Sequence, residues 1–130
     1  MRVDKQLAIF LENRPGALAA MCETLAEADI NLLALTVSDT VDHAVVRIVT
    51  DRPAQAIHLL GDAGMLVVES DVLVVDAANQ PGALGRIART LAENNVNIEY
   101  AYCTTVAGAE CGALVLRVRD PQKALRLLEA

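Results

Sequence analysis

Apolar residues recur along the chain at two different spacings. Residues 6–11 and 71–77 are short runs rich in apolar residues that end in turn-forming residues, as is typical of β-strands. After each run, apolar residues recur three and four positions apart, which is the spacing of one face of a helix. The two sets are Leu18, Met21, Cys22, Leu25 and Ala26, and Leu84, Ile87, Ala88, Leu91 and Ala92. Each run therefore predicts a strand followed by a helix whose apolar stripe faces a sheet.

Two hairpins and two further helices are expected after these elements. The hairpin strands are residues 32–38 with 44–50, and residues 98–106 with 111–118, and each pair flanks a short turn. Helices are expected to begin near Pro53 and Pro121, because proline suits the first helical turn. Asp29 and the pair Asn94-Asn95 stand where the earlier helices end, since Asp and Asn tolerate left-handed backbone. Gly64 ends the helix that follows Pro53.

The chain repeats itself at an offset of 66 residues, counted from Asn13 to Asn79. The repeated stretches are Asn13-Arg14-Pro15-Gly16-Ala17-Leu18 with Asn79-Gln80-Pro81-Gly82-Ala83-Leu84, Thr24-Leu25-Ala26-Glu27 with Thr90-Leu91-Ala92-Glu93, and Asn31 with Asn97. Further along, Asp51 and Pro53 find partners in Asp120 and Pro121. Self-similarity of this length predicts two tandem modules, residues 1–70 and 71–130. We refer to them as copy one and copy two.

The two copies differ at their ends. In copy one, residues 65–68 supply a fourth strand, which a short connection through residues 69–71 joins to the first strand of copy two. Copy two ends at Ala130 without a counterpart of that strand. Either the edge strand is missing from copy two or another chain supplies it.

Composition and charge narrow the possible partners. The formal net charge of −6 and a pI near 4.8 disfavour nucleic acid and anionic membranes, because both are bound through Lys and Arg. The charged start and the lack of a long apolar run favour a cytoplasmic protein. Cys22, Cys103 and Cys111 have no metal-binding spacing, and the favoured interpretation is that they are small buried hydrophobes. The alternative is that Cys103 and Cys111 face each other across a hairpin.

These residues resemble those of a known family. An apolar strand, Asn-x-Pro-Gly-Ala-Leu, an amphipathic helix and then Ile-Asn-Leu or Val-Asn-Ile are similar to the ACT domain, and the tandem arrangement resembles small proteins with two ACT domains. The resemblance implies an α+β fold of two ferredoxin-like βαββαβ modules, with antiparallel sheets side by side and helices on one face. It also implies a non-catalytic regulator that binds an amino acid at the seam between modules.

The loop after each first strand is chemically suited to such a ligand. A helix N-terminus offers unpaired N–H groups to a carboxylate, and Gly16 and Gly82 allow close approach to the backbone. The resemblance places ligand contacts at four asparagines, whose side-chain oxygens can accept from an ammonium group. Singly, each asparagine is more often a turn or capping residue. The predicted ligand-binding residues are Leu11, Asn13, Pro15, Gly16, Ala17, Leu18, Asn31 and Leu32 in copy one, and Asn79, Gly82, Ala83, Leu84, Asn97 and Ile98 in copy two.

One departure from the family bears on the ligand. Serine-binding members have a histidine two residues before the loop asparagine, whereas this chain has Leu11 and Ala77. Serine is therefore disfavoured, and an apolar or aromatic amino acid is the expected ligand. The sequence leaves open whether one copy or both bind it.

The sequence offers little support for other functions. His43 and His58 form no catalytic or metal-ligand pattern, and neither a P-loop nor a dinucleotide fingerprint is present, so no cofactor, metal or catalytic residue is predicted. RNA-binding modules of the same topology need aromatic residues on the central strands, where this chain has Val, Leu and Ile.

The serious alternative is an assembly module whose second sheet face buries against a second copy or a partner enzyme, because residues 32–35 and 73–75 are apolar on both faces. Tyr100 and Tyr102 share one face and would line a pocket, an interface or the core.

Overall fold

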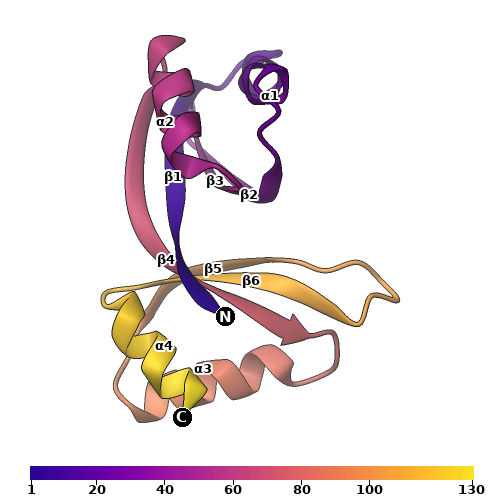
Figure 1. The fold of residues 1–130 in the computed structure, drawn as a ribbon, viewed down its shortest axis with the longest axis vertical. Helices are drawn as coiled ribbons and strands as arrows, with labels where there is room; N and C mark the ends of the chain where they lie inside the picture. Colours follow the sequence, from indigo (N-terminus) through magenta and orange to yellow (C-terminus); the bar gives the residue numbers. More distant parts are fainter. The chain divides into compact units, whose positions relative to one another are not determined.

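The structure is a computed structural model that describes all 130 residues. Its elements are β1 (Arg2–Glu12), α1 (Ala17–Glu27), β2 (Leu32–Asp39), β3 (His43–Thr50), α2 (Pro53–Asp62), β4 (Leu66–Ala78), α3 (Ala83–Glu93), β5 (Ile98–Thr104), β6 (Cys111–Val118) and α4 (Pro121–Glu129). Hydrogen bonding orders the six strands as β2-β3-β1-β4-β6-β5. The predicted α+β fold with βαββαβ repeats is confirmed (Figure 1).

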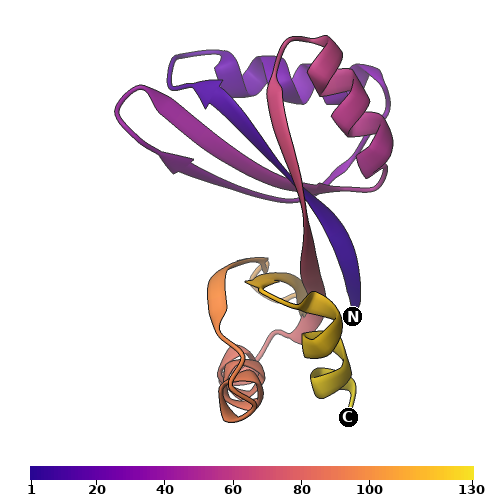
Figure 2. The ribbon, with the colours of Figure 1, turned by 90° about the vertical axis from the view of Figure 1, so that its left-hand side faces the viewer.

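The chain divides into two compact units. The N-terminal unit is Lys5–Ser70, and the C-terminal unit combines Met1–Asp4 with Asp71–Ala130. In the first unit β3 pairs antiparallel with both β1 and β2, and in the second β6 pairs antiparallel with both β4 and β5. In each unit the two helices lie on the same side of its strands (Figures 1 and 2). Each unit therefore has one covered sheet face.

The first four residues provide the strand that copy two lacks. In the strand order, β1 is the neighbour of β4, and Met1–Asp4 belong to the same compact unit as copy two. Val3 packs against the apolar core of that unit. The sequence left open whether this strand is missing or supplied by another chain, and in the structure the chain's own N-terminus lies in its position. A local sequence pattern does not reveal such a distant neighbour.

Each core lies between the covered sheet face and its two helices. Met21 and Leu25 of α1 are almost fully buried against Leu7 and Ile9 of β1 in the first unit. Leu91 of α3 packs in the same way in the second unit, in a cluster that also contains Leu73, Val75, Leu114, Leu116 and Val118. The predicted helical stripes are thus confirmed. The exceptions are the first and last members of the two stripes, because Leu18, Ala26, Leu84 and Ala92 are exposed.

The ends of the helices follow from side-chain chemistry. Asp29 and Asn95 are the two non-glycine residues with positive φ, at 59° and 58°, and each follows the first helix of its copy. Gly64 adopts φ 86° after α2. The prediction that these residues end helices is confirmed, because Asp, Asn and Gly enter left-handed backbone at low cost.

Three local expectations were wrong. The expected connection through residues 69–71 is part of β4, which runs without a break from Leu66 to Ala78. Cys103 and Cys111 are exposed and Cys22 is half-buried, so the cysteines are not buried hydrophobes. Cys103 pairs with Leu114 and not with Cys111. The last pair before the β5–β6 turn is Thr104 with Ala113, so Cys111 lies beyond the paired part of this hairpin.

The second face of the sheet is less open than expected. Tyr100 and Tyr102 pair with Arg117 and Val115, on the face away from the helices, and both are half-buried. On that same face Val74 and Val115 are 3% and 0% exposed within the single chain. Part of this face is therefore buried without the partner that the sequence led us to expect. None of the four helices is long and apolar enough to cross a membrane.

Candidate functional site

The Asn-x-Pro-Gly segment forms the same loop in both copies. In copy one the Arg14 N–H donates to the Glu12 carbonyl and the Ala17 N–H donates to the Arg14 carbonyl, at 3.0 and 3.3 Å. Gln80 and Ala83 make the matching bonds in copy two. Gly16 and Gly82 both adopt φ 86° as the residues that precede α1 and α3. The prolines lie in the turn and not in the helix, so glycine is the residue that starts each helix.

Both loops leave the following helix without a cap. No side chain caps α1 or α3, and no protein acceptor faces the N–H groups of Leu18 and Ala19 or of Leu84 and Gly85. Of the other two helices, α2 also lacks a side-chain cap, whereas Asp120 caps α4 by accepting from the Lys123 N–H at 3.1 Å. Free N–H groups and the positive end of the helix dipole favour an anion. Each loop therefore presents backbone N–H groups of the kind that suit an anion.

Asn13 and Asn79 tie these loops to the neighbouring hairpins. The Asn79 side-chain amide donates to the carbonyl oxygens of Val106 and Ala109, at 3.3 and 2.8 Å. Its backbone N–H donates to Glu110 at 2.9 Å. Asn13 makes equivalent bonds to the hairpin of copy one, from Nδ2 to Thr40 at 3.3 Å and from N to Asp42 at 3.0 Å. These bonds use the amide donors, and the side-chain oxygens remain available as acceptors.

Asn31 and Asn97 lie at the opposite end of their own copies. Asn31 precedes β2 beside Asp51, whereas Asn13 lies beside Asp42, at the other end of β3. β3 has eight residues, so roughly 25 Å of strand separates the two asparagines. Asn97 is separated from Asn79 by β6 in the same way. The structure does not bring the two asparagines of one copy together.

A small cavity adjoins the loop of copy two. Its volume is about 160 Å³, and its lining residues are Ala77, Ala78, Asn79, Gln80, Ala83, Leu84, Cys103, Thr105, Gly112, Ala113 and Leu114. Sequence reasoning missed the part contributed by β5 and β6, because only strand register shows that the hairpin lies beside the loop. A Cβ at Gly112 would collide with the Thr104 carbonyl oxygen, so glycine is required where the hairpin backbone approaches.

The other predicted residues divide between core and surface. Leu11, Ala17 and Ala83 are buried, and Leu32 and Ile98 are half-buried. Pro15 and Gly16 are exposed in the loop, as are Leu18 and Leu84 one residue beyond the start of their helices. The exposed members are therefore the loop itself and the first leucine of each helix.

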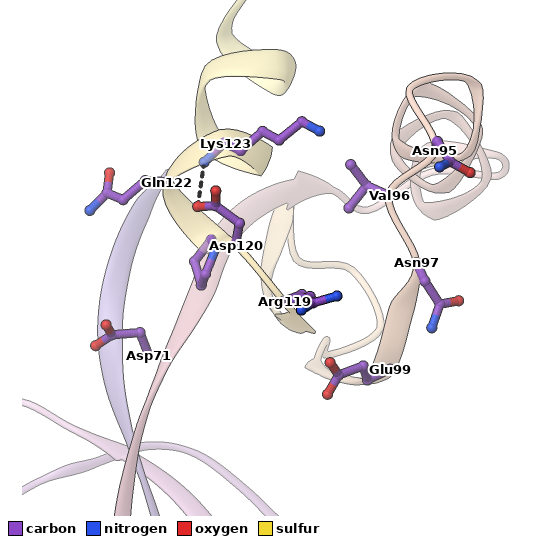
Figure 3. Close-up of a pocket in the computed structure, with 10 residues that line it drawn as sticks. Asp71, Asn95, Val96, Asn97, Glu99, Arg119, Asp120, Gln122 and Lys123 are labelled. Carbon is purple, nitrogen blue, oxygen red and sulfur yellow. Dashed lines mark hydrogen bonds between the residues drawn. The ribbon is translucent and has the colours of Figure 1, made fainter.

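A second, larger cavity lies at the other end of copy two, and every residue that lines it belongs to the C-terminal unit. Its volume is about 850 Å³. The turn between α3 and β5 forms one wall, and the junction of β6 with α4 forms the other (Figure 3). Its lining residues are Asp71, Asn95, Val96, Asn97, Glu99, Arg119, Asp120, Pro121, Gln122 and Lys123. No group of three or more His, Cys, Asp or Glu residues is placed to hold a metal ion.

Comparison with known proteins identifies the family. The model of the ACT domain pair matches residues 1–129. Protein BT0572 from Bacteroides thetaiotaomicron is 34% identical, with a TM-score of 0.90 over 98% of this chain and 87% of that one. The regulatory subunits of aspartate kinase from Thermus thermophilus, in its ligand-free form, and from Thermus flavus share the fold at 16% and 19% identity. The Thermus thermophilus subunit has a TM-score of 0.70, over 99% of this chain and 96% of its own. The Thermus flavus subunit has a TM-score of 0.66, over 98% of this chain and 94% of its own.

No curated protein sequence matches the chain. The family match covers almost the whole chain, and it agrees with the repeated loops and the order of the strands. The chain belongs to the ACT domain pair family.

Proposed function

We propose that the protein is a regulatory protein that binds an amino acid at its Asn-x-Pro-Gly loops. The observation that carries this proposal is the pair of uncapped helix N-termini, each preceded by a left-handed glycine. A backbone site of this kind suits the carboxylate that all amino acids share. The proposal assigns the ligand no covalent chemistry.

Copy two offers the more complete site. The carboxylate of the ligand would accept from the N–H groups of Leu84 and Gly85, and its ammonium group would donate to the Asn79 side-chain oxygen. The side chain of the ligand would enter the 160 Å³ cavity, whose walls include Ala77, Ala83 and Leu114. A cavity of about 150 Å³ is large enough for a benzene ring. An apolar side chain with a branched chain or one ring fits these dimensions.

Serine fits this site poorly. Leu11 and Ala77 precede the two loops, and neither side chain can form a hydrogen bond to a hydroxyl group. Unless it reaches Gln80 or Thr105, two polar residues of the cavity wall, a serine hydroxyl group would lack a partner, which costs about 1–3 kcal/mol. We expect the same cost to disfavour other short polar amino acids.

Asn31 and Asn97 would contribute to a loop site only from a second copy of the chain. Each lies too far from the loop of its own copy to contact the same ligand, because an amino acid is much shorter than an eight-residue strand. In the proposed assembly, a second copy of the chain would supply both contacts.

The regulatory part of the proposal has separate support. The fold is shared with proteins described as regulatory subunits of aspartate kinase. A ligand that binds one state of an assembly better than another shifts the balance between them. We propose that amino-acid binding changes how the protein associates with a partner metabolic enzyme or with a second copy.

A second candidate function is assembly without a small-molecule ligand. It is favoured by the exposure of Leu33, Leu35 and Val37 on β2, an edge strand that carries no charged side chain before Asp39. Unprotected apolar edges pair with other strands. Under this alternative the protein self-associates through β2, and amino acids have no effect on it.

An NMR titration distinguishes the two functions. We expect leucine, valine or phenylalanine to shift the amide resonances of Leu84 and Gly85 in a saturable way, while serine at the same concentration does not. If none of the twenty amino acids moves these resonances, the loop is not a ligand site and the assembly function is favoured. Saturable shifts that are confined to residues outside both loops would also contradict the proposed site.

A further inference from the structure

At the large cavity of copy two, a contact that is present in copy one is missing. In copy one the Asn31 N–H donates to the Asp51 carboxylate at 3.0 Å, and the Asp51 N–H donates to the Asn31 carbonyl at 3.2 Å. Arg52 reaches across the same gap and donates to the Asp29 carbonyl. These contacts join the turn that precedes β2 to the start of α2.

Copy two has the same backbone elements with the two charges in the opposite order. Thr50 pairs with Leu32 and Val118 pairs with Ile98, so these residues mark equivalent strand ends. Asp51 and Arg52 follow in copy one, whereas Arg119 and Asp120 follow in copy two. Arg52 and Asp120 are the residues that precede α2 and α4. The equivalent of Asp51 is therefore Arg119, and not Asp120, which the comparison of the two copies by sequence had paired with Asp51.

This exchange leaves the gap in copy two open. Asp120 turns to its own helix and accepts from the Lys123 N–H at 3.1 Å. No hydrogen bond joins Arg119 or Asp120 to Asn95 or Asn97, and the Asn97 N–H has no acceptor in the protein. The carboxylate that occupies this position in copy one is thus absent, while the N–H group that binds it in copy one is still present.

The side chains around the gap carry both signs of charge, three carboxylates and two cations. The carboxylates are engaged within the chain: Glu99 is paired with Arg117, at 3.8 Å, and Asp120 serves as a helix cap. Asp71 also has an interaction within the chain. The Arg119 guanidinium and the Lys123 ammonium have no partner in the protein. In Figure 3 Arg119 extends from the end of β6 toward the wall that carries Asn97 and Glu99. Two cations without a carboxylate partner therefore line the same cavity as the N–H group that lacks an acceptor.

We propose that this cavity is a binding site for a small organic carboxylate. A carboxylate group of the ligand accepts from the Asn97 N–H and from Arg119, and so takes the place that the Asp51 side chain holds in copy one. A second acidic group of the ligand pairs with Lys123. Arginine and backbone N–H groups form strong, directional bonds with carboxylates, so the site distinguishes carboxylates from spherical anions. It is separate from the Asn-x-Pro-Gly loops, and its occupancy does not depend on an amino acid binding there.

Titration of the full chain with succinate, followed by amide NMR, tests the proposal. We expect saturable shifts of the Asn97, Arg119 and Lys123 resonances in the millimolar range of succinate, with Leu18 and Leu84 unmoved. Sodium chloride at matched ionic strength is the control for screening, and sodium sulfate is the control for a general anion. Shifts that never saturate, or that sulfate reproduces equally well, would overturn the proposal.

The internal repeat provides the decisive variant. Arg119→Asp places in copy two the carboxylate that closes copy one, and we expect succinate affinity to fall by about tenfold or more, as for loss of a charged hydrogen bond. Arg89→Asp makes the same charge change on the exposed part of α3 and should leave affinity unchanged. Arg119→Gln removes the charge without adding an acid. It replaces Arg119→Asp in the titration if that variant does not fold. Unchanged affinity in a folded Arg119 variant would exclude the site.

Discussion

The side-chain amide of Asn79 donates to the carbonyl oxygen of Ala109 at 2.8 Å and so joins the loop before α3 to the β5–β6 hairpin. The two residues are 30 positions apart in the sequence. This bond fixes the hairpin beside the loop, and the cavity that we assign to an amino-acid side chain lies between them. An asparagine that resembles a ligand-binding residue therefore also builds the wall of the site.

Asn79→Ala should destabilise the protein more than Asn13→Ala. The first variant loses side-chain bonds to two carbonyl oxygens and the second loses a bond to one. With about 1 kcal/mol for each such bond, the free energy of unfolding should fall by roughly 2 and 1 kcal/mol. Chemical denaturation measures both values. Equal losses, or a larger loss for Asn13→Ala, would contradict this account of the loop.

Gly82→Asp and Gly82→Asn should separate ligand binding from stability. Both substitutions place a side chain at φ 86°, where the cost is about 1–2 kcal/mol for most residues and lower for Asn and Asp. An added Cβ would lie 3.1 Å from the flexible end of Arg86, which can move. The acid should abolish amino-acid binding at this loop through its negative charge, whereas the amide should weaken it less. Calorimetric titration of both folded variants checks the order, and equal affinities would argue against a carboxylate at the loop.

Removal of residues 1–4 should weaken the C-terminal unit selectively. Val3 packs against the core formed by β4, β6 and the two C-terminal helices. Hydrogen exchange should therefore accelerate at Leu73 and Leu116, while Met21 and Leu25 of the other unit keep their protection. Met1→Ala, at an exposed position in the same segment, is the control. Faster exchange in the N-terminal unit alone would show that the first strand does not complete copy two.

Asp51→Ala should loosen the start of β2. The variant removes the acceptor of the Asn31 N–H and should lower the free energy of unfolding by about 1 kcal/mol. Exchange of the Asn31 amide should become faster, which NMR detects directly. Asp42→Ala, an exposed position in the β2–β3 turn, is the matched control. An unchanged Asn31 exchange rate would mean that the Asp51 bond is not formed in solution.

Much of the fold was predictable because its determinants are local. Helix stripes, the two hairpins and the left-handed residues Asp29 and Asn95 depend on the spacing and chemistry of neighbouring residues. The N-terminal strand of copy two was not predictable in this way. Its position depends on pairing between segments about 70 residues apart, for which Val3 and its neighbours carry no local signal.

The candidate site was only partly predictable for a related reason. A repeat identifies equivalent residues, such as Asn13 and Asn79, but it gives no distances. Asn31 therefore resembled a neighbour of Asn13, although a strand separates them. The exchange of charges at Arg119 was hidden because Asp51 and Asp120 are the same residue type. Only the strand ends at Thr50 and Val118 give the correct equivalence.

A thermal-shift screen of the twenty amino acids, on the unmodified chain and on the double variant Gly16→Asp with Gly82→Asp, tests the central claim most directly. A ligand at a hundred times its dissociation constant stabilises the folded state by about 2.7 kcal/mol. We predict a rise in Tm for one or a few apolar or aromatic amino acids and no rise in the double variant. An equal rise in both proteins, or no rise with any amino acid at millimolar concentration, would contradict binding at the Asn-x-Pro-Gly loops.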